Sequence, residues 1–403
     1  MSPLKVIFIN NVHLLYAARC LRGFGDGFAV IILPAYLSAF GLTPAQIGLV
    51  ATASLFGTAV FTLLVGLIAP RHDLRNMLLL GAALMVFTGI VFPSFEHWML
   101  IAAVAFIGTI NPSTGDIGVL VPLEHASLAR GVTDEERTRV FARYSLIGAL
   151  SMAAGALAAG VTDILIAWGV GNLAAFKLMF YLYATLGLMA AVVYRRLPPT
   201  PAESFRPVAP LGPSRHVVYK LAALFSVDAF AGGFIVQSLL ALWLFKKFEL
   251  SLAAASLFFF WSGVLSAFSY PIAAQIAGRI GLINTMVFTH IPSSICLIAA
   301  AFSPDLTLAL GLLLVRSALS QMDVPTRTSY VMAVVTPDER TAAAGVTAVP
   351  RSLASSISPA FSGMLLTLPF SGLPLVFCGA LKIAYDLALL YSFRHIKPPE
   401  EKV

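Results

Sequence analysis

The chain has 403 residues, of which 59% are hydrophobic and 11% are charged. Soluble domains carry about 25% charged residues, so this composition excludes an ordinary soluble protein. Basic loops on one side of a membrane explain the net charge of +7 better than nucleic acid binding does.

The apolar residues recur in runs of about 20, the length of a helix that crosses the hydrocarbon core of a bilayer. Backbone groups inside lipid must be hydrogen-bonded within the chain, so these runs are predicted to be helices. The first run precedes no small-residue cleavage site, so we expect a retained helix rather than a signal peptide. Twelve transmembrane spans are predicted, at residues 12–38, 44–69, 77–94, 98–123, 138–160, 173–195, 217–245, 252–276, 283–303, 306–333, 341–367 and 372–393.

A polar segment separates the sixth span from the seventh. From Arg195 to Val217 it contains six prolines and four arginines, which is typical of a linker and not of a helix. The predicted organisation is an N-terminal six-helix bundle at 1–196, a cytoplasmic linker at 197–216 and a C-terminal six-helix bundle at 217–403.

The two halves share a short sequence motif. Residues 132–138 read VTDEERT and residues 335–341 read VTPDERT, which are 335 − 132 = 203 positions apart, about half the chain. Each copy of this motif forms a predicted charged loop between long apolar runs. Parallel halves of this kind are a recurrent plan of secondary transporters, in which the substrate site lies between the halves near the membrane midplane.

Lysine and arginine gather in the loops that follow even-numbered spans, with Lys246 and Lys247 as the exception. Cytoplasmic loops carry such an excess of positive charge, so both termini are predicted to be cytoplasmic. We expect a multi-pass protein of a cell membrane, and specifically of a bacterial inner membrane.

After the second span, residues 66–75 read GLIAPRHDLR, and the second-half counterpart at 274–281 reads AQIAGRIG. With the two six-helix halves and the basic central loop, the chain resembles the major facilitator superfamily over essentially its whole length. That family's signature in this loop is Gly-x-x-x-Asp-Arg-x-Gly-Arg. Gly66, Arg71, Arg279 and Gly281 match it, whereas Asp73 stands at its second glycine and its acid is absent. The resemblance implies a transporter, usually monomeric, whose spans 1, 4, 7 and 10 line a central cavity.

Charged side chains inside a membrane are costly and mark pathways or partners. Span 1 holds Arg19, Arg22 and Asp26, whose spacing places them on one helix face. Arg22 is expected to pair with Asp26, which leaves Arg19 either to bind a ligand or to reach the cytoplasmic interface. Asp228 in span 7 lies 228 − 26 = 202 residues after Asp26, close to the repeat offset. These two acids are predicted to carry protons, or alternatively to form structural salt bridges.

Span 4 contains the polar sequence Asn-Pro-Ser-Thr-Gly-Asp at residues 111–116. Proline frees a backbone carbonyl, and a membrane tolerates such a break where protein or a water-filled cavity satisfies the backbone. We therefore expect ligand contacts from Asn111, Ser113 and Thr114, with Asp116 as a proton or gating group. Glu124, about two turns further, is predicted to be a gate residue.

Span 10 holds Arg316, Asp323 and Arg327 on one face. Arg316 lies near mid-bilayer, and its planar guanidinium suits a carboxylate or phosphate. Asp323 is expected to pair with one of these arginines. By the repeat offset, Arg327 corresponds to Glu124 (327 − 203 = 124), so the two are predicted to form a salt bridge between the halves when the cytoplasmic side closes.

Spans 5, 11 and 12 carry further charges. Arg143 is a third candidate ligand contact, and Arg351 is another intramembrane cation. Lys382 and Asp386 are four residues apart and are predicted to pair within their own helix as a structural element.

The leading prediction is a secondary active transporter that moves a small anionic or zwitterionic solute by alternating access, coupled to protons. Efflux of drugs or other amphipathic cations is the alternative, which the cavity arginines disfavour. Metal-ion export is weaker, because no Cys/His set has the spacing of ligands for a soft metal. The odd cysteines Cys20, Cys296 and Cys378 indicate no disulfide. We expect no enzyme activity, no cofactor and no nucleic acid partner.

Overall fold

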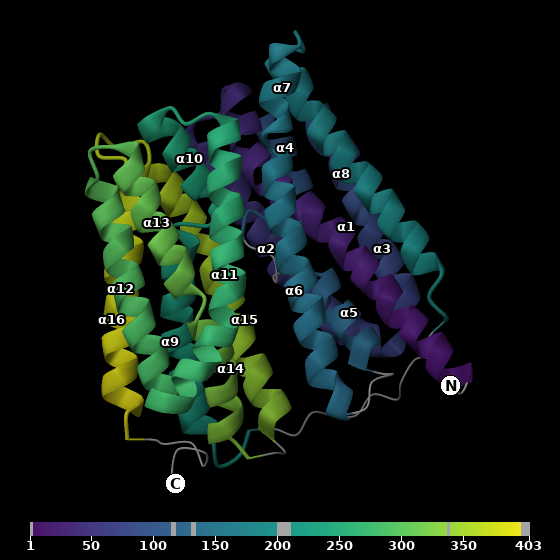
Figure 1. Ribbon diagram of the computed structural model, residues 1–403, viewed down its shortest axis with the longest axis vertical. Coiled ribbons are helices and arrows are strands. Elements are labelled where there is room, and N and C mark those ends of the chain that lie inside the picture. The colour runs from purple at the N-terminus through teal and green to yellow at the C-terminus, as the bar shows by residue number, and fades with distance from the viewer. Residues whose placement is uncertain (1–2, 114–117, 130–133, 200–210, 337–338, 396–403) are drawn as a thin grey trace.

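The computed structural model describes residues 3–113, 118–129, 134–199, 211–336 and 339–395. Throughout these ranges the secondary structure is helical, with no β-strand, as predicted. Figure 1 shows two bundles, α1 to α8 and α9 to α16, with both termini at the same end of the molecule.

The first bundle follows the predicted spans 1 to 6. Its helices are α1 (Pro3–Ala39), α2 (Pro44–Ile68), η1 (Ala69–Arg71), α3 (Leu74–Val91), η2 (Phe92–Ser94), α4 (Trp98–Ile107), α5 (Leu120–Ala129), α6 (Asp134–Ala158), α7 (Val161–Ala167) and α8 (Asn172–Arg195).

The second bundle follows the predicted spans 7 to 12. Its helices are α9 (Arg215–Gly233), α10 (Gln237–Phe248), α11 (Leu252–Ile280), α12 (Leu282–Phe302), α13 (Leu306–Ser320), α14 (Asp323–Val334), α15 (Arg340–Leu365) and α16 (Leu373–Phe393). The linker between the bundles falls largely on residues outside the described ranges.

Ten helical segments of the described chain are long and apolar enough to cross a membrane. The other two predicted spans correspond to α4 with α5, which the chain divides, and to α15, which contains two prolines and several serines. That all twelve cross the bilayer, with both termini in the cytoplasm, stays a prediction.

Three of the predicted spans are broken near their middle. Span 4 is divided into α4 and α5, span 7 into α9 and α10, and span 10 into α13 and α14. At the break in span 4, backbone groups that lack helical partners form hydrogen bonds with a nearby side chain and with the other bundle. The amide of Ser113 donates to Asn111 Oδ1 at 2.9 Å, and the carbonyl of Pro112 accepts from the amide of Ser238 in the other bundle at 3.0 Å. The sequence Asn111-Pro112 thus produces the interruption that it predicted.

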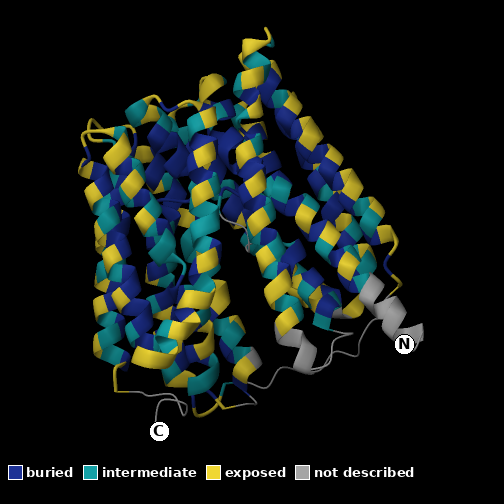
Figure 2. Cartoon of the chain, in the orientation of Figure 1, coloured by how far each residue is buried: buried dark blue, intermediate teal, exposed yellow. Residues whose placement is uncertain are grey.

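The outer surface of the helices is rich in large apolar side chains. Figure 2 shows exposed residues along the outward faces of the helices and buried residues between them. Exposed examples are Leu150 on α6, Leu188 on α8 and Phe268 on α11. Because soluble monomers rarely expose such extended apolar surface, these faces are suited to lipid.

The two bundles share one hydrophobic core and diverge away from it. The shared core contains Phe28 and Leu37 of α1 together with Leu240 and Trp243 of α10. Two further cores lie each within one bundle, and they contain residues near the end that carries the termini. The bundles accordingly meet at the end opposite the termini, as Figure 1 also shows.

Close backbone packing seals the shared end. A Cβ on Gly48 of α2 would lie 2.4 Å from the carbonyl oxygen of Pro359 on α15, and one on Gly363 would lie 2.5 Å from that of Pro44. Nearby, the amide of Ala360 donates to Thr52 Oγ1 at 2.9 Å. Glycine at both positions lets α2 and α15 approach to backbone contact.

Candidate functional site

A cavity of about 370 Å³ lies between the two bundles. All three broken spans contribute to it, through Ser113, Gln237 and Gln321. The first bundle otherwise presents Arg19 and apolar side chains of α2 and α6. Nearly all the polar lining therefore comes from the second bundle.

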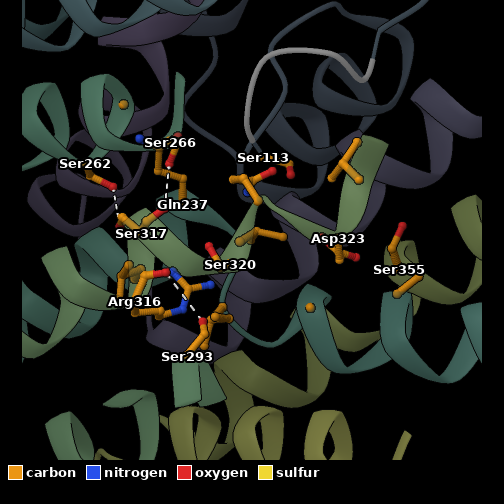
Figure 3. A pocket seen from close by; sticks show the side chains of 18 of the residues that line it. Ser113, Gln237, Ser262, Ser266, Ser293, Arg316, Ser317, Ser320, Asp323 and Ser355 are labelled. Atoms are coloured by element: carbon orange, nitrogen blue, oxygen red, sulfur yellow. Dashed lines mark hydrogen bonds between the residues drawn. The ribbon is translucent and has the colours of Figure 1, made fainter. Parts of the chain in front are cut away.

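Hydroxyl groups are the commonest polar groups of the lining. Ser262 and Ser317 hydroxyls are hydrogen-bonded at 2.7 Å, and Ser266 Oγ donates to the Ser317 carbonyl at 3.2 Å. Figure 3 shows these serines on one side of Gln237, with Ser293 and Ser320 beside Arg316. The serines of the lining are Ser113, Ser262, Ser266, Ser293, Ser294, Ser317, Ser320, Ser352 and Ser355.

Two arginines of this lining have no counter-ion. The guanidinium groups of Arg316 on α13 and Arg351 on α15 form no ion pair or hydrogen bond with the residues that the structure describes. Ser293 Oγ contacts only the backbone carbonyl of Arg316, at 3.4 Å. An arginine stays charged inside a protein, so both are available to an anion from the cavity.

The other two permanent cations that the second bundle contributes to the described lining are paired with Asp228 on α9. Arg327 Nη1 lies 3.0 Å from Asp228 Oδ2 and 3.1 Å from Asp323 Oδ2, and Lys382 Nζ lies 2.6 Å from Asp228 Oδ1. The predicted pairing of Asp323 with an arginine is thus present. Asp228 bridges α9 to α14 and α16, and all four side chains line the cavity.

Lys382 and Asp386 do not pair with each other, so the prediction of a salt bridge within their helix is wrong. Lys382 reaches Asp228 and also His290 Nε2, at 3.2 Å, whereas Asp386 accepts from His290 Nδ1 at 3.1 Å. The rotation of α16 turns Lys382 toward α9 and α12. Span 12 thereby contributes to the lining of the cavity, in addition to spans 1, 4, 7 and 10, which the family resemblance implied.

The first bundle carries an enclosed ion pair at the corresponding place. Glu124 of α5 is fully buried and binds Arg22 of α1, and it accepts hydrogen bonds from the hydroxyls of Tyr144 and Tyr194. Arg22 therefore pairs with Glu124, and the predicted Arg22–Asp26 pair is wrong.

Glu124 and Arg327 are each bound within their own bundle. Their predicted bridge belongs to a state closed at the cytoplasmic end, and it would require both local networks to open. It stays a prediction for that state.

Asp26 lies outside the large cavity. It lines a small void of about 30 Å³ inside the first bundle, with Asn111 and Tyr183. The Tyr183 hydroxyl donates to Asp26 Oδ1 at 3.2 Å and lies 3.1 Å from the hydroxyl of Thr109. Asp26 and Asp228 therefore do not face one cavity in this conformation.

Of the remaining predicted ligand contacts, some line the cavity and others do not. Arg19 is buried, lines the cavity and lies 5.0 Å from the centroid of the Tyr144 ring, so it does not extend to the aqueous interface. Ser113 also lines the cavity. Arg143 is exposed and lies outside the lining, and Thr114 and Asp116 fall outside the described residues.

The loop segments that resemble the family signature have structural roles. Asp73 caps α3 by accepting from the Arg75 amide at 2.9 Å, and Gly281 has a φ of +88° between α11 and α12. Arg71 and Arg279 are exposed. A Cβ on Gly66 would meet no atom within 4 Å.

Several polar residues of the cavity had not been assigned to the site from the sequence. Besides the serines of the second bundle, they include Gln237, His290, Arg351 and Lys382. A histidine within an apolar span was the one available signal for His290, because ionisable groups at this depth usually have a function.

Comparisons with known proteins agree with this architecture. The family model described as the Major Facilitator Superfamily matches residues 15–359. An uncharacterized membrane protein of Saccharomyces cerevisiae is 26% identical, with 95% of this chain and 94% of the relative covered.

Two solved structures share the fold at low identity. A D-xylose-proton symporter is 15% identical with a TM-score of 0.75, and 97% of this chain and 98% of that chain are covered. A bacterial homolog to the human lysosomal transporter Spinster, in an inward-facing and unoccupied conformation, is 15% identical with a TM-score of 0.71, and 97% and 96% are covered. These neighbours are transporters and not enzymes. Because the family model spans most of the chain, the protein belongs to the Major Facilitator Superfamily, a family of membrane transporters.

Proposed function

We propose that the protein is a secondary active transporter of a small hydroxylated organic anion or zwitterion, coupled to protons. The observation that carries this proposal is a pair of arginines, Arg316 and Arg351, that have no counter-ion among the residues the structure describes and lie beside a serine-rich cavity between the two bundles.

The charge of the lining favours an anion. Within the described part of the chain, its permanent cations are Arg19, Arg316, Arg327, Arg351 and Lys382, against the carboxylates Asp228 and Asp323. With His290 neutral the sum is 5 − 2 = +3. A buried charge without a partner is costly, so a carboxylate entering the cavity would replace the missing counter-charge. An amphipathic cation would meet repulsion, which weighs against the efflux alternative.

The hydroxyl groups favour a polar, hydroxylated ligand. Serine can both donate and accept hydrogen bonds, so the lining suits the hydroxyls of a sugar acid or hydroxycarboxylate. A cavity of about 370 Å³ lies at the lower end of the range for small-molecule sites. A site built to hydrogen-bond hydroxyls discriminates strongly against analogues that lack them.

The arrangement of the bundles supports alternating access. The shared core and the Gly48–Gly363 contact close one end, and the bundles diverge toward the end that carries the termini. With both termini in the cytoplasm, as the basic loops predict, this is the inward-facing state. Rocking of one bundle against the other would expose the same cavity to the opposite side.

A thermal-stability assay of the purified protein tests the proposal. The panel comprises hydroxylated carboxylates such as D-gluconate, sugar phosphates, neutral sugars, amino acids, amphipathic cations and metal ions. A ligand at about 100 times its Kd stabilises the native state by about 2.7 kcal/mol. We expect hydroxylated carboxylates to raise the Tm of the wild type, with no rise for Arg316→Gln.

Arg143→Gln is the matched control, because Arg143 is also an intramembrane arginine but lies outside the cavity. It should respond like the wild type. Stabilisation by amphipathic cations alone, removed by Asp26→Asn, would instead establish the efflux alternative.

A further inference from the structure

We propose that the His290–Asp386 pair is the proton-binding site that couples proton movement to anion movement. This inference rests on the proposed function and names the group that carries its proton. It assigns that role to α12 and α16, whereas the sequence had pointed to carboxylates of spans 1, 4, 7 and 10.

The pair is buried yet connected to the cavity. His290 and Asp386 are both less than 3% exposed, and His290 lines the cavity. The imidazole ring of His290 lies between a carboxylate and an ammonium group. Its Nδ1 lies 3.1 Å from Asp386, and its Nε2 lies 3.2 Å from Lys382 Nζ and 3.9 Å from Asp228 Oδ1.

The charge count of this network is short by one positive charge. Among the groups joined to His290 through successive ion pairs, the carboxylates are Asp228, Asp323 and Asp386 and the permanent cations are Arg327 and Lys382, so their sum with a neutral imidazole is 2 − 3 = −1. One proton on His290 brings the sum to zero. Because an uncompensated charge is costly at low dielectric, the network offers a defined place for a single proton.

The hydrogen bonds define how the proton would be held. With Nδ1–H donating to Asp386, Nε2 carries the lone pair and accepts from the Lys382 ammonium. A proton that enters adds to Nε2, which can then no longer accept from Lys382. Lys382 retains Asp228, and the protonated ring has a carboxylate oxygen of Asp228 3.9 Å from Nε2 as a counter-charge. Proton uptake therefore breaks the contact between His290 and Lys382 and leaves both cations beside Asp228.

Charged and titratable groups of the surrounding helices line the same cavity as His290 or contact its ring. These are Asp228 of α9, Tyr270 of α11, Arg316 of α13, Asp323 and Arg327 of α14, Arg351 of α15, and Lys382, Tyr385 and Asp386 of α16. Lys382 and Asp386 are the ones in hydrogen-bond contact with the ring.

The same geometry links the proton to the anion. Ser293, one turn after His290, contacts the backbone of Arg316 at 3.4 Å. A proton on His290 raises the formal charge of the described cavity lining from +3 to 3 + 1 = +4, which increases its attraction for an entering carboxylate. Proton binding thus favours anion binding, and by linkage the anion favours the proton.

The first test requires no substrate. Imidazole 15N signals of histidine-labelled protein in detergent are followed from pH 5.5 to 8.5, and His290 is assigned by its absence from His290→Gln. We expect its ring to gain and lose a proton within this range, and Asp386→Asn to shift the midpoint by at least one pH unit. The control Asp305→Asn, at an exposed carboxylate of another loop, should leave it unchanged. A ring that keeps one protonation state throughout would refute the proposal.

The second test separates coupling from transport. In proteoliposomes with D-gluconate as the probe, Asp386→Asn, at a residue outside the cavity lining, should lose at least tenfold of the accumulation driven by a proton gradient and keep counterflow exchange. Retained proton-driven accumulation in Asp386→Asn would overturn the inference while leaving the proposed function intact. Absence of D-gluconate transport by the wild type would count against the proposed function, and the 15N titration would still decide the proton site.

Discussion

Each bundle places an ion pair between corresponding spans, but with opposite polarity. In the first, span 1 supplies Arg22 and span 4 supplies Glu124; in the second, span 7 supplies Asp228 and span 10 supplies Arg327. The surroundings differ as well. Two tyrosine hydroxyls complete the first pair inside the protein, whereas the second pair extends to Lys382 and opens onto the cavity.

This difference indicates that the two structurally related bundles have different roles. An enclosed pair, whose carboxylate accepts hydrogen bonds on both oxygens, holds α1, α5, α6 and α8 together. A network that faces a cavity, beside arginines that have no counter-ion among the described residues, can respond to a ligand and a proton. The N-terminal bundle therefore acts mainly as a scaffold, and the C-terminal bundle carries most of the binding groups.

The largest effect is expected from breaking the enclosed pair. Arg22→Met leaves Glu124 charged and buried without a cation, which costs about 3–5 kcal/mol of stability. Thermal unfolding in detergent, followed by fluorescence, measures this loss. The double variant Arg22→Met with Glu124→Gln should recover much of it, because neither charge is then buried alone. A double variant as unstable as Arg22→Met would contradict the assignment of Glu124 to a scaffold ion pair.

An intermediate effect is expected where the bundles meet. Gly48→Ala places a Cβ 2.4 Å from the carbonyl oxygen of Pro359, so α2 and α15 must separate. Such overpacking costs about 1–3 kcal/mol and should lower the Tm. Gly66→Ala, on the same helix with nothing within 4 Å, is the control and should hold or raise the Tm by removing a helical glycine. Equal Tm values for the two variants would argue against a sealed contact at Gly48.

The smallest effect is expected at the start of α15. Glu339 accepts hydrogen bonds from Ser214 Oγ at 2.6 Å, from Thr336 Oγ1 at 2.7 Å and from the Gly212 amide at 2.5 Å. These bonds favour the carboxylate and lower the pKa of Glu339 to about 2. They also tie the end of the linker to the second bundle.

A lowered pKa gives stability that is present above the ordinary carboxyl pKa and is lost as the pH falls toward about 2. The Tm difference between wild type and Glu339→Gln should therefore be present at pH 7 and shrink between pH 5 and pH 2. The exposed Glu249→Gln provides the comparison, with no such trend expected. A Tm difference that does not change with pH would indicate that the charge of Glu339 is unimportant.

The sequence predicted the features that depend on local pattern. Apolar runs located the helices, the Asn111-Pro112 pair located the break in span 4, and the depth of Arg316 indicated a cavity residue. These features depend on the bilayer thickness and on backbone hydrogen bonding, which act on any chain in the same way.

The pairing of charges could not be predicted, because it depends on the rotation of each helix. Lys382 and Asp386 have ideal spacing for a pair on one helix, yet each finds a stronger partner on a neighbouring helix. Arg22 likewise reaches Glu124, 102 residues away, instead of Asp26 one turn along. In a low-dielectric interior, tertiary partners prevail over local ones when they complete more hydrogen bonds.

Uptake into proteoliposomes tests the central claim most directly. The measurement is accumulation of labelled D-gluconate, or of the hydroxylated carboxylate that raises the Tm most, under an imposed proton gradient. The account predicts accumulation by the wild type and by Arg143→Gln, with loss of at least tenfold in Arg316→Gln. Transport that persists unchanged in Arg316→Gln, or that is confined to amphipathic cations and depends on Asp26, would contradict it.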